Sequence, residues 1–563
     1  MDPRAIFQLR RFGSVAIAVA ATALAISTLL SVSAQAAEGG TLRVPFPQPD
    51  GGLTPYTFEL GYPLMTLIYD TLLWRDSEGK PQPWLAKDLE VEDGGRRVFV
   101  ELRNGARWHD GEPLTASDVV FSFDFMRERF HPRFTPQLEA IDSVRATGAN
   151  SVVFELRHPS LGFRAGALAD VPILPEHLWA GLPETQIAPP GRPIGSGPYR
   201  LIGRLADGGY RFRAHGGYFL GQPRPARLEV PIISRQEATV AALERGEVGM
   251  IPANLPPALA ERLDGLSVEI ATGPLYTGTV LLLNTRTSPF DSRPLRQAVS
   301  LAIDPARIAA GVGGAVAADR GYLHPESRWA PRRPLHNTDE QAASQQLSRS
   351  AIGEIEVLAP EADPLRREAA RQVVLALQRA GAQARLRPLS APRLNAELVS
   401  SGDPQFAAAV VASSPLPSHD PDYLSAVFGS GSIPAPLNRS GYASTRFGQL
   451  AAKVAAAPDP AQRRAAVTRE LQLLAVDAPE IPLLFADGAY AFRPAEHVGW
   501  QFIAGSGVLD KRSFLPLRQE GAGRAAPSGL RADGSGGLGG LAIAAICLLA
   551  LALGVGAYGL LRD

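Results

Sequence analysis

Residues 84–123 read WLAKDLEVEDGGRRVFVELRNGARWHDGEPLTASDVVFSF. Within residues 98–102, Val and Leu alternate with Phe and Glu, which is the period-two pattern of a half-buried strand. Asn104-Gly105 tolerates the positive φ values of a tight turn, so residues 106–109 are predicted to return as a partner strand. Thr115 and Asp118 then have the spacing of a capping box. The stretch therefore predicts a strand, a turn, a second strand and a capped helix.

The same stretch resembles the signature of the family 5 extracellular solute-binding proteins, which are the dipeptide, oligopeptide and nickel receptors of ABC importers. The residues that match it in order and spacing are Leu102-Arg103, Gly105, Trp108, Asp110-Gly111, Leu114-Thr115-Ala116 and Asp118-Val119. A second series matches further along the chain: Asn284, Pro289-Phe290, Arg296-Gln297-Ala298 and Ala302-Ile303-Asp304. The resemblance spans residues 41–516.

This resemblance implies an α/β, periplasmic-binding-protein-like fold of type II, in which two lobes and an inserted subdomain are joined by a hinge. The first lobe is expected to consist of three separate segments, residues 37–77, 195–272 and 484–518. The inserted subdomain is expected at residues 78–194 and the second lobe at residues 273–483.

Three further segments are predicted outside this body. Residues 1–36 are typical of an export signal, because arginines precede an apolar run and Ala34-Gln35-Ala36 offers a cleavage site. Arg10-Arg11 is a poor twin-arginine match, so an ordinary basic region is favoured. Residues 519–540 have the Gly- and Ser-rich composition of a flexible linker. Residues 541–561 are apolar enough to form a transmembrane anchor, which would place the protein on the outer face of the cytoplasmic membrane.

Charge and cysteine content exclude several classes of protein. The 563 residues contain 56 basic and 56 acidic side chains, without the concentrated positive charge that nucleic acid requires. The single cysteine, Cys547, excludes an internal disulfide framework and a cysteine-based metal cluster.

Enzyme motifs are also missing, because the sequence contains no H-E-x-x-H, no G-x-x-x-x-G-K-[ST] and no G-x-S-x-G. We therefore predict no catalytic residue, no metal site, no cofactor and no enzyme activity.

The resemblance implies that the ligand cleft is bordered by residues 49–62 and 412–423. Its candidate ligand contacts are Asp50, Tyr56, Glu59, His419, Asp420 and Asp422. For Asp50, Tyr56, Glu59 and His419 an ordinary exposed loop position remains the alternative.

Other expectations can be compared with the structure. Residues 67–72 are predicted to be the last residues of an apolar helix, and residues 281–284 are predicted to form a buried strand. Asp304-Pro305 is predicted to cap and begin a helix. Gly249 and Gly448 each replace an aspartate that is usual in the family.

The predicted function is that of the extracytoplasmic substrate-binding component of an ABC importer, acting as a monomer. It would capture a peptide or another small solute and deliver it to the permease and ATPase subunits. A surface receptor or adhesion protein on the same fold, or a hydrolase, remains an alternative.

Residues 410–417 lack the charged side chains with which oligopeptide receptors hold a peptide's ammonium and carboxylate groups. The ligand is therefore expected to be neutral, anionic or N-blocked, unless Asp420 binds an ammonium in a shifted geometry.

Overall fold

A computed structural model describes residues 40–58, 61–252, 255, 257–263, 265–350, 352–399, 404, 406–413, 420–429 and 437–516. These residues all belong to one compact unit, Met1–Arg518. The predicted export signal, linker and membrane anchor lie outside the described residues. Among the helices of the described ranges, none combines the length and the apolar character needed to cross a membrane.

A six-stranded sheet forms the centre of the predicted second lobe. Its strand order is β12 (Ala315–Ala317), β16 (Glu480–Phe492), β11 (Glu269–Leu283), β15 (Ala408–Ala412), β13 (Ile355–Pro360) and β14 (Ala384–Leu389). The pairs β15–β13 and β13–β14 are parallel, and the other pairs are antiparallel.

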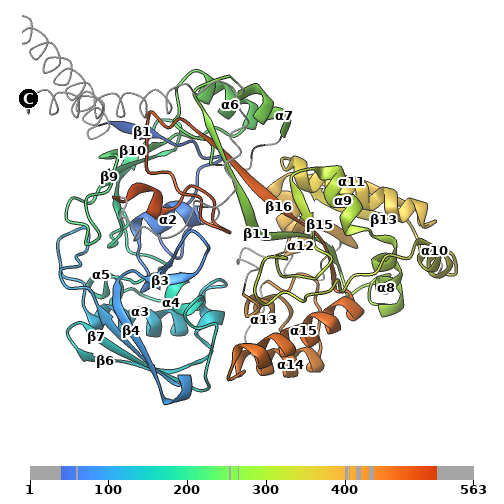
Figure 1. The fold of residues 1–563 in the computed structure, drawn as a ribbon, viewed down its shortest axis with the longest axis horizontal. Helices are drawn as coiled ribbons and strands as arrows, with labels where there is room; N and C mark the ends of the chain where they lie inside the picture. Colours follow the sequence, from blue (N-terminus) through green and yellow to red (C-terminus); the bar gives the residue numbers. More distant parts are fainter. Residues whose placement is uncertain are drawn as a thin grey trace, which may run out of the picture. The chain divides into compact units, whose positions relative to one another are not determined.

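Strands β11 and β16 are the longest strands of the described residues and run side by side (Figure 1). Their pairing extends from Glu269 opposite Phe492 to Leu282 opposite Glu480, with a shift of register between Pro274 and Gly278. The apolar run at the end of β11 is buried, which explains its continuous hydrophobic sequence. Both strands therefore extend from the predicted second lobe into residues that are predicted to belong to the first lobe.

Helices cover both faces of the six-stranded sheet. Leu281 and Leu283 of β11 face a core that includes α8, α9 and α11, whereas Val280 and Leu282 face a core that includes α13, α14 and α15. The helices of this region are α8 (Arg293–Ala302), α9 (Pro305–Val312), α10 (Glu340–Ser348), α11 (Pro364–Arg379), α12 (Ala391–Leu398), α13 (Tyr423–Phe428), α14 (Thr445–Ala455) and α15 (Pro460–Asp477).

The rest of the described chain contains two four-stranded sheets, one hairpin and several short helices. The first sheet has the order β1 (Thr41–Arg43), β10 (Arg227–Val230), β9 (Tyr210–Ala214) and β8 (Tyr199–Arg204). The second has the order β4 (Ala86–Glu92), β5 (Arg97–Leu102), β7 (Ser151–Leu156) and β6 (Ile141–Gly148). The hairpin pairs β2 (Leu73–Arg75) with β3 (Pro81–Pro83). The helices of this part are α2 (Tyr62–Ile68), α3 (Ala116–Glu128), α4 (Ala167–Asp170), α5 (Glu176–Trp179), α6 (Gln236–Glu244) and α7 (Pro257–Ala260).

The capping box before α3 is confirmed. Thr115 is the N-cap, and the Asp118 carboxylate accepts a hydrogen bond of 2.8 Å from the Thr115 backbone N–H. Asp304 is likewise confirmed as the cap of α9, where its carboxylate accepts from the N–H groups of Ala306 and Arg307. Both caps use residues within three positions of each other, so local sequence was sufficient to predict them.

Two sequence predictions are wrong. Residues 106–109 do not pair with β5, because β4 and β7 already occupy both edges of that strand. They form instead a small loop in which Arg107 bridges to Pro113. The helix predicted to extend to residue 72 ends four residues earlier, at Ile68, because Tyr69 adopts an extended backbone with φ of −113° and ψ of 134°.

Candidate ligand-binding site

Asp50 lies in the loop before α2 and is only 8% exposed. Its carboxylate accepts hydrogen bonds from the backbone N–H groups of Gly51 and Gly61. Its carbonyl oxygen accepts from the Tyr210 hydroxyl at 2.7 Å. The side chain therefore closes the loop from residue 50 to residue 61.

Tyr56, from the same loop, packs into the predicted inserted subdomain. Its hydroxyl donates to the carbonyl oxygen of Arg129 at 2.7 Å. Its ring makes edge contacts with Phe125 and His131, at centroid distances of 5.8 and 5.2 Å. Burial raises the pKa of this phenol, so the hydroxyl stays protonated and acts as a donor.

Glu59 and His419 lie outside the described residues. The structure therefore describes four of the six predicted ligand contacts. It brings Asp420 and Asp422 together and leaves Asp50 and Tyr56 in separate contacts.

Asp420 and Asp422 precede α13, and both carboxylates contact the guanidinium of Arg463 in α15. Arg463 Nη2 donates to Asp420 Oδ1 at 2.9 Å and to Asp422 Oδ1 at 2.6 Å. The Arg463 side chain is 1% exposed, whereas that of Asp422 is 39% exposed. The guanidinium also lies 4.6 Å from the ring centroid of Trp329. A buried cation from α15 thus fixes both predicted acidic contacts.

A third carboxylate, that of Glu470, is buried in the same region. It is 1% exposed, and its Oε2 has no hydrogen-bond partner among the described residues. Burial, followed by the nearby charge of Asp422, raises the pKa of Glu470. Partial burial and the charge of Asp420 raise the pKa of Asp422 as well, against the opposing effect of Arg463. Glu470 and Asp422 therefore retain their protons more readily than free carboxylic acids do.

Several buried polar atoms of the predicted second lobe lack partners among the residues that the structure describes. Besides Glu470 Oε2, they include Oγ of Ser413, immediately after β15, and Nε2 of His324. Nδ1 of His324 accepts from the Glu326 N–H at 3.2 Å, so Nε2 carries the ring proton. Burial lowers the pKa of His324 to about 4, which keeps the ring neutral. Ser413 and His324 are candidate ligand-binding groups that sequence reasoning missed, since only burial without a partner singles them out.

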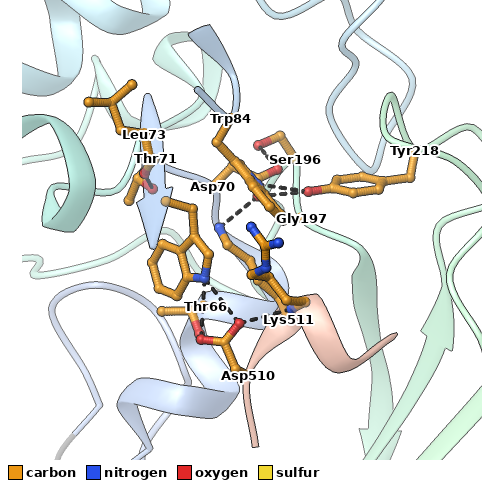
Figure 2. A network of polar contacts seen from close by, with 12 residues as sticks. Thr66, Asp70, Thr71, Leu73, Trp84, Ser196, Gly197, Tyr218, Asp510 and Lys511 are labelled. Carbon is orange, nitrogen blue, oxygen red and sulfur yellow. Dashed lines mark hydrogen bonds and ion pairs between the residues drawn. The ribbon is translucent and has the colours of Figure 1, made fainter. Parts of the chain in front are cut away.

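A buried ion pair joins two segments of the predicted first lobe, residues 37–77 and 484–518 (Figure 2). Asp70 follows α2, and its carboxylate accepts hydrogen bonds from Lys511 Nζ at 2.9 Å and from Trp84 Nε1 at 2.8 Å. The hydroxyls of Tyr218 and Ser196 donate to the same carboxylate at 3.0 and 3.1 Å. Both Asp70 and Lys511 are fully buried.

Asp510 completes this network by accepting from Trp74 Nε1 at 3.0 Å. Lys511 Nζ lies 4.1 Å from the ring centroid of Trp74. Burial lowers the pKa of Lys511, and the interaction with Asp70 opposes that shift. Figure 2 shows Asp70, Trp84, Ser196, Tyr218 and Lys511 converging from segments far apart in the sequence, so the network stabilises the return of the chain.

A cavity of about 270 Å³ lies elsewhere, beside the start of β16. Its lining includes Gln297 and Ser300 of α8, Leu471 of α15, and Tyr322. None of the described candidate contacts lines it. Within the described ranges, no group of three or more His, Cys, Asp or Glu side chains is arranged to hold a metal ion.

The fold is shared with solved solute-binding proteins. The oligopeptide-binding protein AppA from Bacillus subtilis, solved in complex with a nonapeptide, superposes with a TM-score of 0.74 at 22% identity, covering 86% of this chain and all of AppA. NikZ from Campylobacter jejuni, solved in complex with Ni(L-His), gives a TM-score of 0.70 at 21% identity, covering 80% of this chain and 94% of NikZ. The α/β fold is therefore that of the periplasmic binding proteins.

Sequence comparison gives the family. The profile of the bacterial extracellular solute-binding proteins, family 5 Middle, matches residues 80–434, which is more than half of the chain. AppA from Bacillus subtilis (strain 168) is 28% identical over 249 residues, which are 42% of this chain and 45% of AppA. The chain spans about half the length of the curated relatives that it matches. It belongs to the family 5 bacterial extracellular solute-binding proteins.

Proposed function

We propose that this protein is the extracytoplasmic substrate-binding component of an ABC importer. The proposal is supported mainly by membership of the family together with a fold that matches the whole of AppA. In this role the protein binds a solute between its lobes and delivers it to permease and ATPase subunits without chemical turnover. The predicted domain boundaries and the ligand contacts at Asp50, Tyr56, Glu59, His419, Asp420 and Asp422 stay predictions.

The relatives bind different solutes, since the AppA complex holds a nonapeptide and the NikZ complex holds nickel with histidine. Within this range we propose a peptide-sized or smaller solute that is not recognised through a free amino terminus. Two observations support this. The described residues 410–413 carry no charged side chain, and the carboxylates of Asp420 and Asp422 are already bound to Arg463. A buried ammonium without a counter-ion would lose several kcal/mol of stabilisation.

Calorimetry tests this specificity. The purified protein is titrated with a mixture of di- to pentapeptides and with the N-acetylated mixture. We expect any binding to survive acetylation, because the carboxylates of Asp420 and Asp422 are bound to Arg463. Micromolar binding that disappears on acetylation would refute the proposal. Loss of that binding in Asp420→Asn would then identify the carboxylate responsible.

The same proposal includes export and attachment by residues 541–561. It is supported by the extracellular family and by the apolar sequence of that segment. Partitioning of the full chain into the detergent phase, and of a chain truncated before Gly534 into the aqueous phase, is the expected result.

A further inference from the structure

Residues 158–163, here called the bridging loop, contact two hydrophobic cores that are built on different sheets. Phe163 is 3% exposed and packs with its ring centroid 5.5 Å from that of Phe154 in β7. Leu161, two residues earlier, packs against the core formed by α13, α14 and α15. The bridging loop therefore joins the predicted inserted subdomain to the predicted second lobe through side chains that are almost adjacent in sequence.

Between these two anchors, Gly162 lies directly against the acidic pair of the second lobe. A Cβ atom built on Gly162 would lie 1.7 Å from Asp422 Oδ2 and 3.0 Å from Arg463 Nη2. Cβ atoms in proteins do not approach other heavy atoms so closely, so an L-residue at this position would prevent the contact. The backbone of Gly162 thus packs on the Asp422–Arg463 pair because it has no side chain.

On the side of the predicted second lobe, the position of the Arg463 guanidinium is restricted by its neighbours. The Arg463 side chain is 1% exposed and packs on Trp329, so the guanidinium cannot move freely. The Asp420 carboxylate accepts a second hydrogen bond from the same guanidinium.

We propose that the bridging loop is a latch, in which Leu161 and Gly162 hold the inserted subdomain against the Asp422–Arg463 pair when the lobes are closed. This inference rests on the proposed solute-binding function, because it assigns the contact a place in lobe closure. It also gives the predicted acidic contacts a role in closing the cleft. Separation of the lobes would expose Leu161 and break the contact of Gly162 with Asp422.

Spin labels measure the latch without any ligand. Cys547→Ser removes the native thiol, and Glu90→Cys in β4 with Ser348→Cys in α10 places one label at an exposed position on each side. Pulsed electron resonance then gives the distribution of distances between the labels. In the otherwise unchanged protein we expect a short-distance population from the latched form.

Gly162→Ala should reduce that population about tenfold, since a methyl group cannot be accommodated in a contact that is already packed. Gly181→Ala is the matched control, because a Cβ atom at Gly181 would meet nothing within 4 Å. The double variant Gly162→Ala/Asp422→Ala should recover part of the short-distance population, because it removes the carboxylate that the methyl group would strike. Circular dichroism is recorded for each variant to confirm that it is folded.

The latch is refuted if Gly162→Ala leaves the distribution unchanged, if Gly181→Ala changes it equally, or if the short-distance population is absent from the parent protein. These outcomes are independent of the peptide calorimetry. A protein that binds solute but shows no effect of Gly162→Ala keeps its proposed function and loses only the latch.

Discussion

At Gly249 the family usually has an aspartate, and the structure shows what occupies that space. A Cβ atom on Gly249 would lie 2.5 Å from Leu42 Cδ1 and 2.8 Å from Glu496 Oε2. A carboxylate from the C-terminal part of the described chain therefore lies beside the position where the resemblance implies an aspartate. Glycine leaves room for Glu496 at this position.

Gly249→Asp should destabilise the protein by about 1–3 kcal/mol, because it overpacks the site and places two carboxylates together. Urea unfolding of the purified protein measures this difference. Gly448→Asp is the control, since Gly448 also replaces a usual aspartate but a Cβ atom there would meet nothing within 4 Å. If both substitutions have the same small effect, Glu496 does not fill the space at Gly249.

Glu480 gives a pH-dependent prediction. It is 1% exposed, and neither carboxylate oxygen has a hydrogen-bond partner in the described part of the chain. Burial raises its pKa from 4.5 to about 7, against the opposing charge of Arg439. Because the folded state binds the proton more tightly than the unfolded state, this group makes the protein less stable as the pH rises from about 4.5 to 7.

Glu480→Gln should therefore be more stable than the parent protein above pH 7, by about 1–3 kcal/mol at roughly 1.4 kcal/mol per pKa unit. Below pH 4.5 the difference should vanish. Denaturant unfolding at several pH values checks both limits, with the exposed Glu90→Gln as control. An equal difference at all pH values would show that packing, and not ionisation, distinguishes the variant.

Among the elements, the 3₁₀ turn Lys511–Phe514 begins with a buried cation, Lys511. Lys511→Met should cost about 3–5 kcal/mol, because it leaves the Asp70 carboxylate buried without its cation. The variant should also expose the C-terminal part of the described chain to proteolysis before the rest unfolds.

The double variant Lys511→Met/Asp70→Asn should recover part of this loss, because the unpaired charge is removed as well. Lys87→Met is the control, since the Lys87 side chain is 55% exposed in its ion pair with Glu101 and should change stability little. A loss for Lys511→Met no larger than for Lys87→Met would show that the buried ion pair does not hold this element.

For the whole molecule, strands β11 and β16 are candidates for a hinge. Their pairing crosses from one predicted lobe to the other and shifts register between Pro274 and Gly278. Closure of two lobes requires a few residues between them to absorb changes in the backbone φ and ψ angles. Removal of the co-purifying solute should therefore increase the radius of gyration in X-ray scattering.

The melting temperature should fall in the same preparation, because the solute stabilises only the native state that binds it. Adding the solute back should reverse both changes. An identical scattering profile with and without the solute would rule out a large closure, although binding itself could still be detected by the melting temperature.

The sequence by itself determined the elements whose signals are local. The capping box at Thr115 and Asp118, the cap at Asp304, and the buried end of β11 were all predicted, because a cap or a hydrophobic pattern involves residues close in the chain. The family was also predicted, since its motifs serve turns and caps and therefore keep a fixed spacing.

Only the tertiary structure decided how distant groups meet. The partners of β5 are β4 and β7, so residues 106–109 could not pair with it although their turn predicted this. Asp70 binds Lys511 across 441 positions of sequence, and Asp420 binds Arg463 across 43. No local pattern encodes such pairs, because burial and charge neutralisation depend on which surfaces the folded chain brings together.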